Sequence, residues 1–130
     1  MKKFLLFIPV LAAFTFYNSC TKDKAQKPIP LLCDSVNAAT NTYNLRIKNY
    51  VDTYCGNTPG CHDALNYVFA GGGIPIHDYA TAKDVFQNGR GLCSIKHEQG
   101  CRAMPDSPYP KLADSLITYI QCWAENGYPQ

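Results

Sequence analysis

The chain has almost no excess of charge of either sign. It has 130 residues, with 12 Lys and Arg against 10 Asp and Glu, and removal of an N-terminal segment that holds Lys2 and Lys3 would leave ten of each. Proteins that bind nucleic acid present a basic face to it. The composition therefore indicates no nucleic-acid partner and no strongly charged docking surface.

Other absences narrow the fold and the function. No stretch alternates apolar and polar residues as a half-buried strand does, so we expect an all-α protein. No Ser/His/Asp set, paired carboxylates or open metal position is evident, so we expect no enzyme activity. The glycines at 71–73 lack the rest of any phosphate-binding fingerprint and are interpreted as a loop.

The N-terminus has the features of an export signal. Lys2 and Lys3 precede an apolar run over 4–16 that is too short for a comfortable membrane span. The following Ser19-Cys20 resembles the cleavage site of a bacterial lipoprotein, and an ordinary signal peptide or an uncleaved anchor is the alternative. We expect a signal peptide over 1–19, acylation of Cys20, a polar tether over 20–32 and a folded domain over 33–130, anchored on the periplasmic or outer side of the cell envelope.

The cysteine content fits an oxidising compartment. Seven cysteines are present, and lipidation of Cys20 would leave six. Six cysteines allow 15 pairings, so the count alone does not fix the disulfides.

Apolar spacing predicts two main helices and two short ones. Tyr43, Ile47, Val51 and Tyr54 form a stripe at helical period, and a second wide apolar face predicts a helix from about Pro110 to Asn126. Short helices are expected after Asp78 and around Leu92 and Ile95. Loops rich in Gly and Pro connect these pieces.

A candidate cofactor motif follows the first helix. The segment Cys55-Gly-Asn-Thr-Pro-Gly-Cys61-His62 has the order of a c-type haem attachment site, whose usual form is Cys-x-x-Cys-His. Five residues separate the two cysteines here, so they must bulge outward to bring both sulfurs to the haem vinyl groups. Met104 lies in a Pro-containing loop about 40 residues later and is the only methionine besides Met1.

The order of these pieces resembles a small class I cytochrome c domain of a bacterial lipoprotein over roughly residues 33–129. That resemblance implies N- and C-terminal helices packed across each other around a haem pocket. It also implies covalent haem c on Cys55 and Cys61, with His62 and Met104 as the axial iron ligands. His/Met ligation suits electron transfer, so the implied function is one-electron exchange with other redox proteins of the envelope.

The remaining cysteines are expected to form two disulfides. Cys93 and Cys101 are close in sequence, and their bond would stiffen the loop that leads to Met104. The helix crossing that the resemblance implies would bring Cys33, before the first helix, to Cys122 in the last one.

Several alternatives compete with the haem interpretation. A Cys55–Cys61 disulfide would make the chain a disulfide-stapled envelope lipoprotein that has lost haem and acts as a binding or structural module. His97 is a competitor of Met104 for the second axial position, although a solvated or capping role is favoured for it, and His77 is interpreted as a loop residue. Zinc is disfavoured because paired Cys-x-x-Cys units are missing.

Overall fold

The described part of the chain is helical. The computed structural model describes residues 33–56, 60–88 and 90–130, and no strand occurs among them, which confirms the all-α prediction. The elements are η1, a π-helical segment (Tyr43–Ile47), and the α-helices α1 (Lys48–Tyr54), α2 (Tyr79–Gln87), α3 (Arg90–Lys96) and α4 (Asp114–Glu125). The predicted signal peptide, Cys20 and the tether lie outside the described residues.

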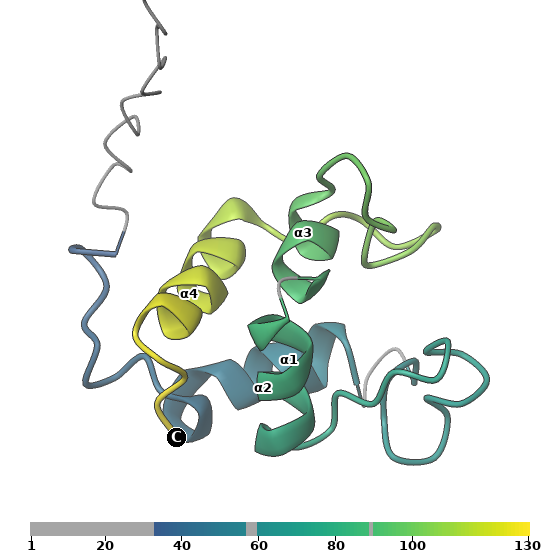
Figure 1. Ribbon diagram of the computed structural model, residues 1–130, viewed down its shortest axis with the longest axis horizontal. Helices are drawn as coiled ribbons and strands as arrows, with labels where there is room; N and C mark the ends of the chain where they lie inside the picture. The colour runs from purple at the N-terminus through teal and green to yellow at the C-terminus, as the bar shows by residue number, and fades with distance from the viewer. Residues whose placement is uncertain (1–32, 57–59, 89) are drawn as a thin grey trace, which may run out of the picture.

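The predicted helix over 43–54 is present as η1 followed directly by α1 (Figure 1). Its apolar stripe faces the core, since Tyr43, Ile47 and Val51 are buried. The side chain of Thr42 caps its start by accepting a hydrogen bond from the backbone N–H of Leu45. Tyr54 ends the stripe but is 40% exposed. It lies at the edge of a cavity next to the end of α1.

Helix α2 begins where Asp78 predicts. The Asp78 side chain accepts from the backbone N–H of Thr81, and the Thr81 hydroxyl in turn accepts from the backbone N–H of Asp78. This reciprocal cap satisfies two N–H groups that the helix itself cannot bond. Ala82 and Phe86 on the inner face are buried.

Helix α4 starts at Asp114, four residues after the predicted start at Pro110. The chain is still extended at Ala113, whose ψ is 141°. This extended approach places Leu112 in the core at 5% exposure. Burial of Leu112 thus competes with an earlier start of the helix.

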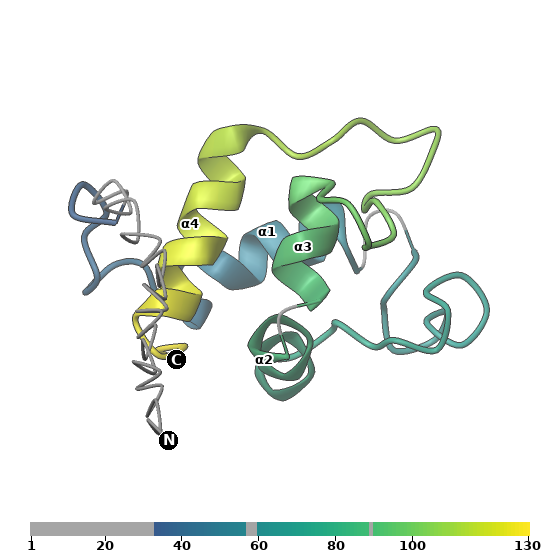
Figure 2. The same cartoon turned by 45° about the horizontal axis from the view of Figure 1, so that its top comes forward.

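Trp123 of α4 is at the centre of the core and has no exposed surface. Its ring makes edge contacts with Phe86 of α2 and Tyr128 of the C-terminal segment and a tilted contact with Tyr43 of η1. The indole N–H donates to the carbonyl of Pro129 at 2.9 Å. Around Trp123, α4 packs against η1 and α3, and α3 packs against α2. Both views show these helices gathered on one side of the molecule and the segment over 62–75 projecting on the other (Figures 1 and 2).

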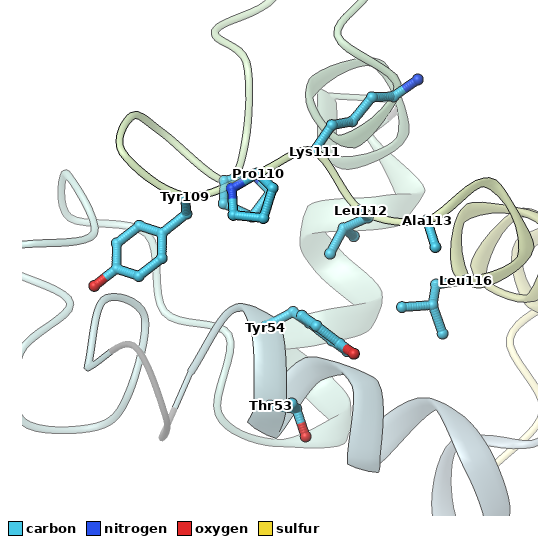
Figure 3. Close-up of a pocket in the computed structure, with 9 residues that line it drawn as sticks. Thr53, Tyr54, Tyr109, Pro110, Lys111, Leu112, Ala113 and Leu116 are labelled. Atoms are coloured by element: carbon cyan, nitrogen blue, oxygen red, sulfur yellow. The ribbon is translucent and has the colours of Figure 1, made fainter.

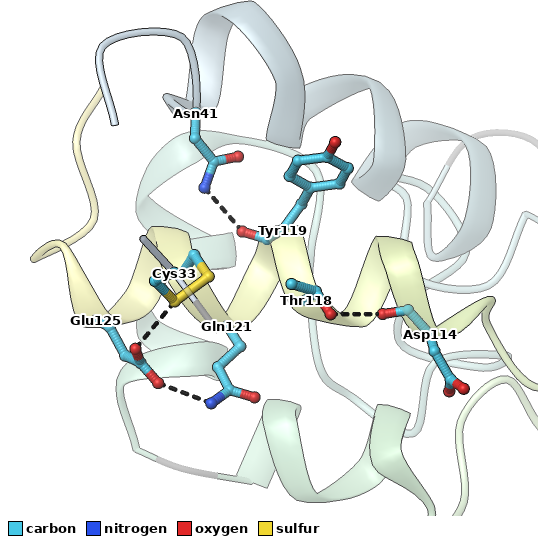
Figure 4. Close-up of a disulfide and its surroundings, with 8 residues drawn as sticks. Cys33, Asn41, Asp114, Thr118, Tyr119, Gln121 and Glu125 are labelled. Atoms are coloured by element: carbon cyan, nitrogen blue, oxygen red, sulfur yellow. Dashed lines mark hydrogen bonds between the residues drawn. A yellow bond between two sulfur atoms is a disulfide. The ribbon is translucent and has the colours of Figure 1, made fainter. Parts of the chain in front are cut away.

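Two disulfides join the pairs that were predicted. Cys33–Cys122 links the segment before η1 to α4 across 89 residues, and Cys93–Cys101 links α3 to the loop that follows it. Close to the first disulfide the side chain of Asn41 donates to the carbonyl of Tyr119 on α4 at 2.9 Å (Figure 4). The start of the described chain is therefore held on α4 by a covalent bond and a hydrogen bond.

Within the residues that the structure describes, no helix combines the length and the hydrophobicity needed to cross a membrane.

Candidate functional site

One cavity brings together the four residues predicted to hold haem. It has a volume of about 590 Å³, and Cys55, Cys61, His62 and Met104 all line it. Its other walls come from the inner faces of α2 and α3, from the loop over 70–76 and from the segment over 100–112, through apolar residues that include Ile76, Val85, Phe86, Ile95 and Leu112. Cavities of a few hundred Å³ with mainly apolar walls and a few placed polar groups are typical of cofactor sites.

The ring of His62 is held by a hydrogen bond from one of its nitrogens to a backbone carbonyl. The residue is 7% exposed, and its Nδ1 lies 2.7 Å from the carbonyl oxygen of Ile74. A carbonyl only accepts, so Nδ1 is the donor in this hydrogen bond, which leaves Nε2 as the ring nitrogen available to a metal ion. This is how metal-binding histidines are usually oriented. No residue type in the sequence indicates this role of Ile74, because it depends on a contact across 12 residues.

Hydrogen bonds join the two ends of the five-residue spacer between the two cysteines. The backbone N–H of His62 donates to the carbonyl of Cys55 at 3.0 Å, and that of Gly60 donates to Gly56 at 2.9 Å. Gly60 has a φ of +68°, which favours glycine. Both sulfur-bearing residues therefore reach one cavity despite the long spacing; residues 57–59 lie outside the described ranges.

Cys55 and Cys61 are not joined in a disulfide. Burial raises the pKa of Cys55 to about 12, and the charge of Cys61 adds to this effect. Cys55 is therefore a protonated thiol at neutral pH.

Met104 enters the cavity from the loop after α3. Its backbone N–H donates to the carbonyl of Ser94 on α3 at 3.0 Å, so the loop is fastened to the helix at this residue. The Cys93–Cys101 disulfide fastens the same loop three residues earlier. This agrees with the expectation that the disulfide stiffens the segment leading to Met104.

The other two histidines do not line this cavity. His97 is exposed, and its Nε2 hydrogen-bonds the carbonyl of Met104 at 3.1 Å, so it contacts the backbone of its supposed competitor. His77 lies in the loop before α2, as predicted, with its Nε2 3.6 Å from the Asp78 carboxylate and its ring close to that of Tyr67.

The loop that supplies the Ile74 carbonyl is organised by Asp63, which sequence reasoning missed. Its carboxylate accepts from the backbone N–H groups of Leu65 and Asn66 and from the Asn66 side chain. These bonds, the Asn66 side chain first, lower the pKa of Asp63. Because these hydrogen bonds favour the charged carboxylate of Asp63, they stabilise the loop at neutral pH. This stabilisation is lost as the pH falls through the lowered pKa of Asp63.

Leu65 and Phe69 of the same loop are 84% and 90% exposed.

Gly71 is the residue of this loop where a side chain would do most harm. An added Cβ would lie 2.6 Å from the carbonyl oxygen of Cys61 and 2.7 Å from Nδ1 of His62. Gly71→Ala should lower the free energy of unfolding by roughly 1–3 kcal/mol, as overpacking does, and displace the His62 ring. Gly72→Asn is the control, because Gly72 has open space around it and a positive φ that Asn tolerates. Thermal unfolding of both variants measures the difference in stability. Equal stability of the two variants would contradict the packing at Gly71.

A second, smaller cavity of about 390 Å³ adjoins the first (Figure 3). Both cavities are bordered by Tyr54, Pro105, Tyr109 and Leu112. In Figure 3 the Tyr54 ring lies below Leu112 and to the left of Leu116. The segment after Met104 therefore separates two apolar spaces.

The described residues contain no group of three or more His, Cys, Asp or Glu side chains that could hold a bare metal ion. A zinc site of protein ligands alone needs about four such groups. Haem iron needs only one or two axial ligands from the protein, and the two residues predicted for that role, His62 and Met104, both line this cavity.

Comparison with protein-family models, with curated proteins and with solved structures finds no match to this chain. Its function is therefore argued from the cavity and the residues that line it.

Proposed function

We propose that this chain is a mono-haem c-type cytochrome that transfers single electrons between redox proteins of the cell envelope. One observation carries the proposal. Cys55, Cys61, His62 and Met104 come from segments on either side of two helices, and the fold brings all four to one largely apolar cavity.

The residues that line the cavity fit a covalently attached haem. His62 offers Nε2 with Nδ1 fixed by Ile74, Met104 offers a thioether, and the two thiols offer sites for covalent attachment. When bound, haem with His and Met as axial ligands supplies a one-electron iron couple of raised potential, with no position left open for a substrate.

The chain's own residues would adjust the redox potential of the haem iron and shield it from water. The buried side chains Ile76, Phe86 and Leu112 keep water away from the interior of the cavity, and a dry environment shifts redox potentials. The bond from His62 to Ile74 holds the ring orientation. Packing of η1 on α4 and the Cys33–Cys122 disulfide support the proposal that the fold is cytochrome c-like, with the first and last helices crossing.

The proposed setting is the periplasmic or outer face of the envelope, with attachment to the membrane through lipid on Cys20. The partners would be other redox proteins. The loop over 64–76 that borders the cavity contains no charged residue, so a partner that meets the site on this side would do so through uncharged groups.

The rival interpretation is a disulfide-stapled module that has lost haem. It predicts a Cys55–Cys61 disulfide and a filled interior. Among the described residues that disulfide is missing and the interior holds a cavity of about 590 Å³, and both observations favour the cytochrome.

Two alanine variants test the attachment. Produced in a host that attaches haem c, Cys61→Ala should lose nearly all covalent haem, because the residue directly precedes the iron ligand His62. Cys55→Ala should keep a substantial fraction through Cys61. Haem staining after denaturing electrophoresis measures both, and Leu65→Ala, which changes an exposed side chain that does not line the cavity, serves as the control. Equal staining of wild type and Cys61→Ala would refute the assignment of Cys61.

A further inference from the structure

His97 and Met104 belong to a closed set of hydrogen bonds at the end of α3. The carbonyl of Ser94 accepts from the backbone N–H of His97 at 3.1 Å and from that of Met104 at 3.0 Å. The imidazole Nε2 of His97 lies 3.1 Å from the carbonyl of Met104. Because that carbonyl only accepts, Nε2 is the donor. Both backbone polar groups of Met104 are therefore bonded to residues 94–97.

The backbone of His97 is set for this bond. His97 follows the last residue of α3 and has a φ of +58°, in the left-handed region that His, Asn and Asp adopt more readily than most residues. The next turn is fixed by the backbone N–H of Glu98, which donates to Cys93 at 3.0 Å, and by the Cys93–Cys101 disulfide. The imidazole thus projects from a turn that is tied to α3.

From this geometry we infer that His97 is a positioning residue for the candidate axial ligand Met104, an inference that rests on the proposed haem site. His97 does not line the cavity. It acts on the backbone of Met104, and with Ser94 it fixes where the Met104 side chain starts. A thioether is a weak, neutral ligand, so a fixed starting point favours its retention at the iron over an incoming ligand.

The first arm of the test needs no haem. Amide hydrogen exchange of Met104, followed by NMR, should be about five- to tenfold faster in His97→Ala than in wild type. The Met104 N–H donates to Ser94, and loss of the His97 bond to the Met104 carbonyl should make opening of that bond easier by the factor that one hydrogen bond contributes. His97→Gln keeps a side-chain N–H donor and should restore most of the protection. Gln99→Ala changes an exposed neutral residue of the same turn and should leave the rate unchanged.

The second arm uses the haem-loaded chain and free imidazole as the probe. Imidazole should displace Met104 at about five- to tenfold lower concentration in His97→Ala, with His97→Gln and Gln99→Ala close to wild type. A merely structural role would leave this competition unchanged.

The outcomes separate the two proposals. Exchange at wild-type rates in His97→Ala would overturn the inference whether or not haem binds. Faster exchange with unchanged imidazole competition would overturn the positioning role. Failure of the wild-type chain to bind haem would refute the proposed function, and the exchange arm would still decide whether His97 holds Met104.

Discussion

Replacing Cys33 and Cys122 together by alanine is expected to lower the free energy of unfolding by about 4–5 kcal/mol. The two residues are 89 apart in sequence, so their bond removes much conformational freedom from the unfolded chain. Typical domains have only about 5–15 kcal/mol of stability in total, so this loss is a large share of the total. Urea denaturation of oxidised wild type and variant measures the difference.

The Cys93–Cys101 pair provides a matched control. Its cysteines are 8 apart, and the same entropy argument gives only about 2–3 kcal/mol for their replacement by alanine. A loss at least as large for the short pair as for the long one would contradict this account of the fold's stability.

Met104→Ala is expected to produce the largest change in the proposed haem site. Loss of the thioether should lower the midpoint potential on the order of 0.1–0.2 V, within the roughly 0.8 V range that axial ligands set. It should also open the second axial position to water and small ligands. Spectroelectrochemical titration of wild type and variant measures the potential.

Two further variants make the Met104 result specific. Met104→His should keep a six-coordinate iron at a lower potential, because imidazole replaces the thioether. Leu65→Ala changes an exposed apolar side chain that does not line the cavity and should leave the potential unchanged. A wild-type potential in Met104→Ala would exclude Met104 as a ligand.

Much of the helical framework could be predicted because it depends on local patterns. The stripe of Tyr43, Ile47 and Val51 is buried as its spacing predicts, and Asp78 caps α2. The start of α4 was placed four residues too early, because only tertiary packing shows that Leu112 must reach the core from an extended segment.

The four candidate site residues could be selected from the sequence, but the contacts that support them could not. Cys55, Cys61, His62 and Met104 were selected by residue type and order, and the structure places them around one cavity; their role in binding haem stays a prediction. The carbonyl of Ile74, which orients His62, and the imidazole of His97, which bonds Met104, act through contacts that no residue type signals. Backbone acceptors look alike in every sequence, so only the fold can identify them.

We propose that this chain carries covalent haem at the cavity that His62 and Met104 line. The decisive measurement is the visible spectrum of the purified, reduced chain, together with haem staining of its band after denaturing electrophoresis. We predict a sharp reduced α-band and covalent stain at the mass of the processed chain. A colourless, stain-negative protein from a host competent in haem attachment would contradict it and favour the disulfide-stapled binding module.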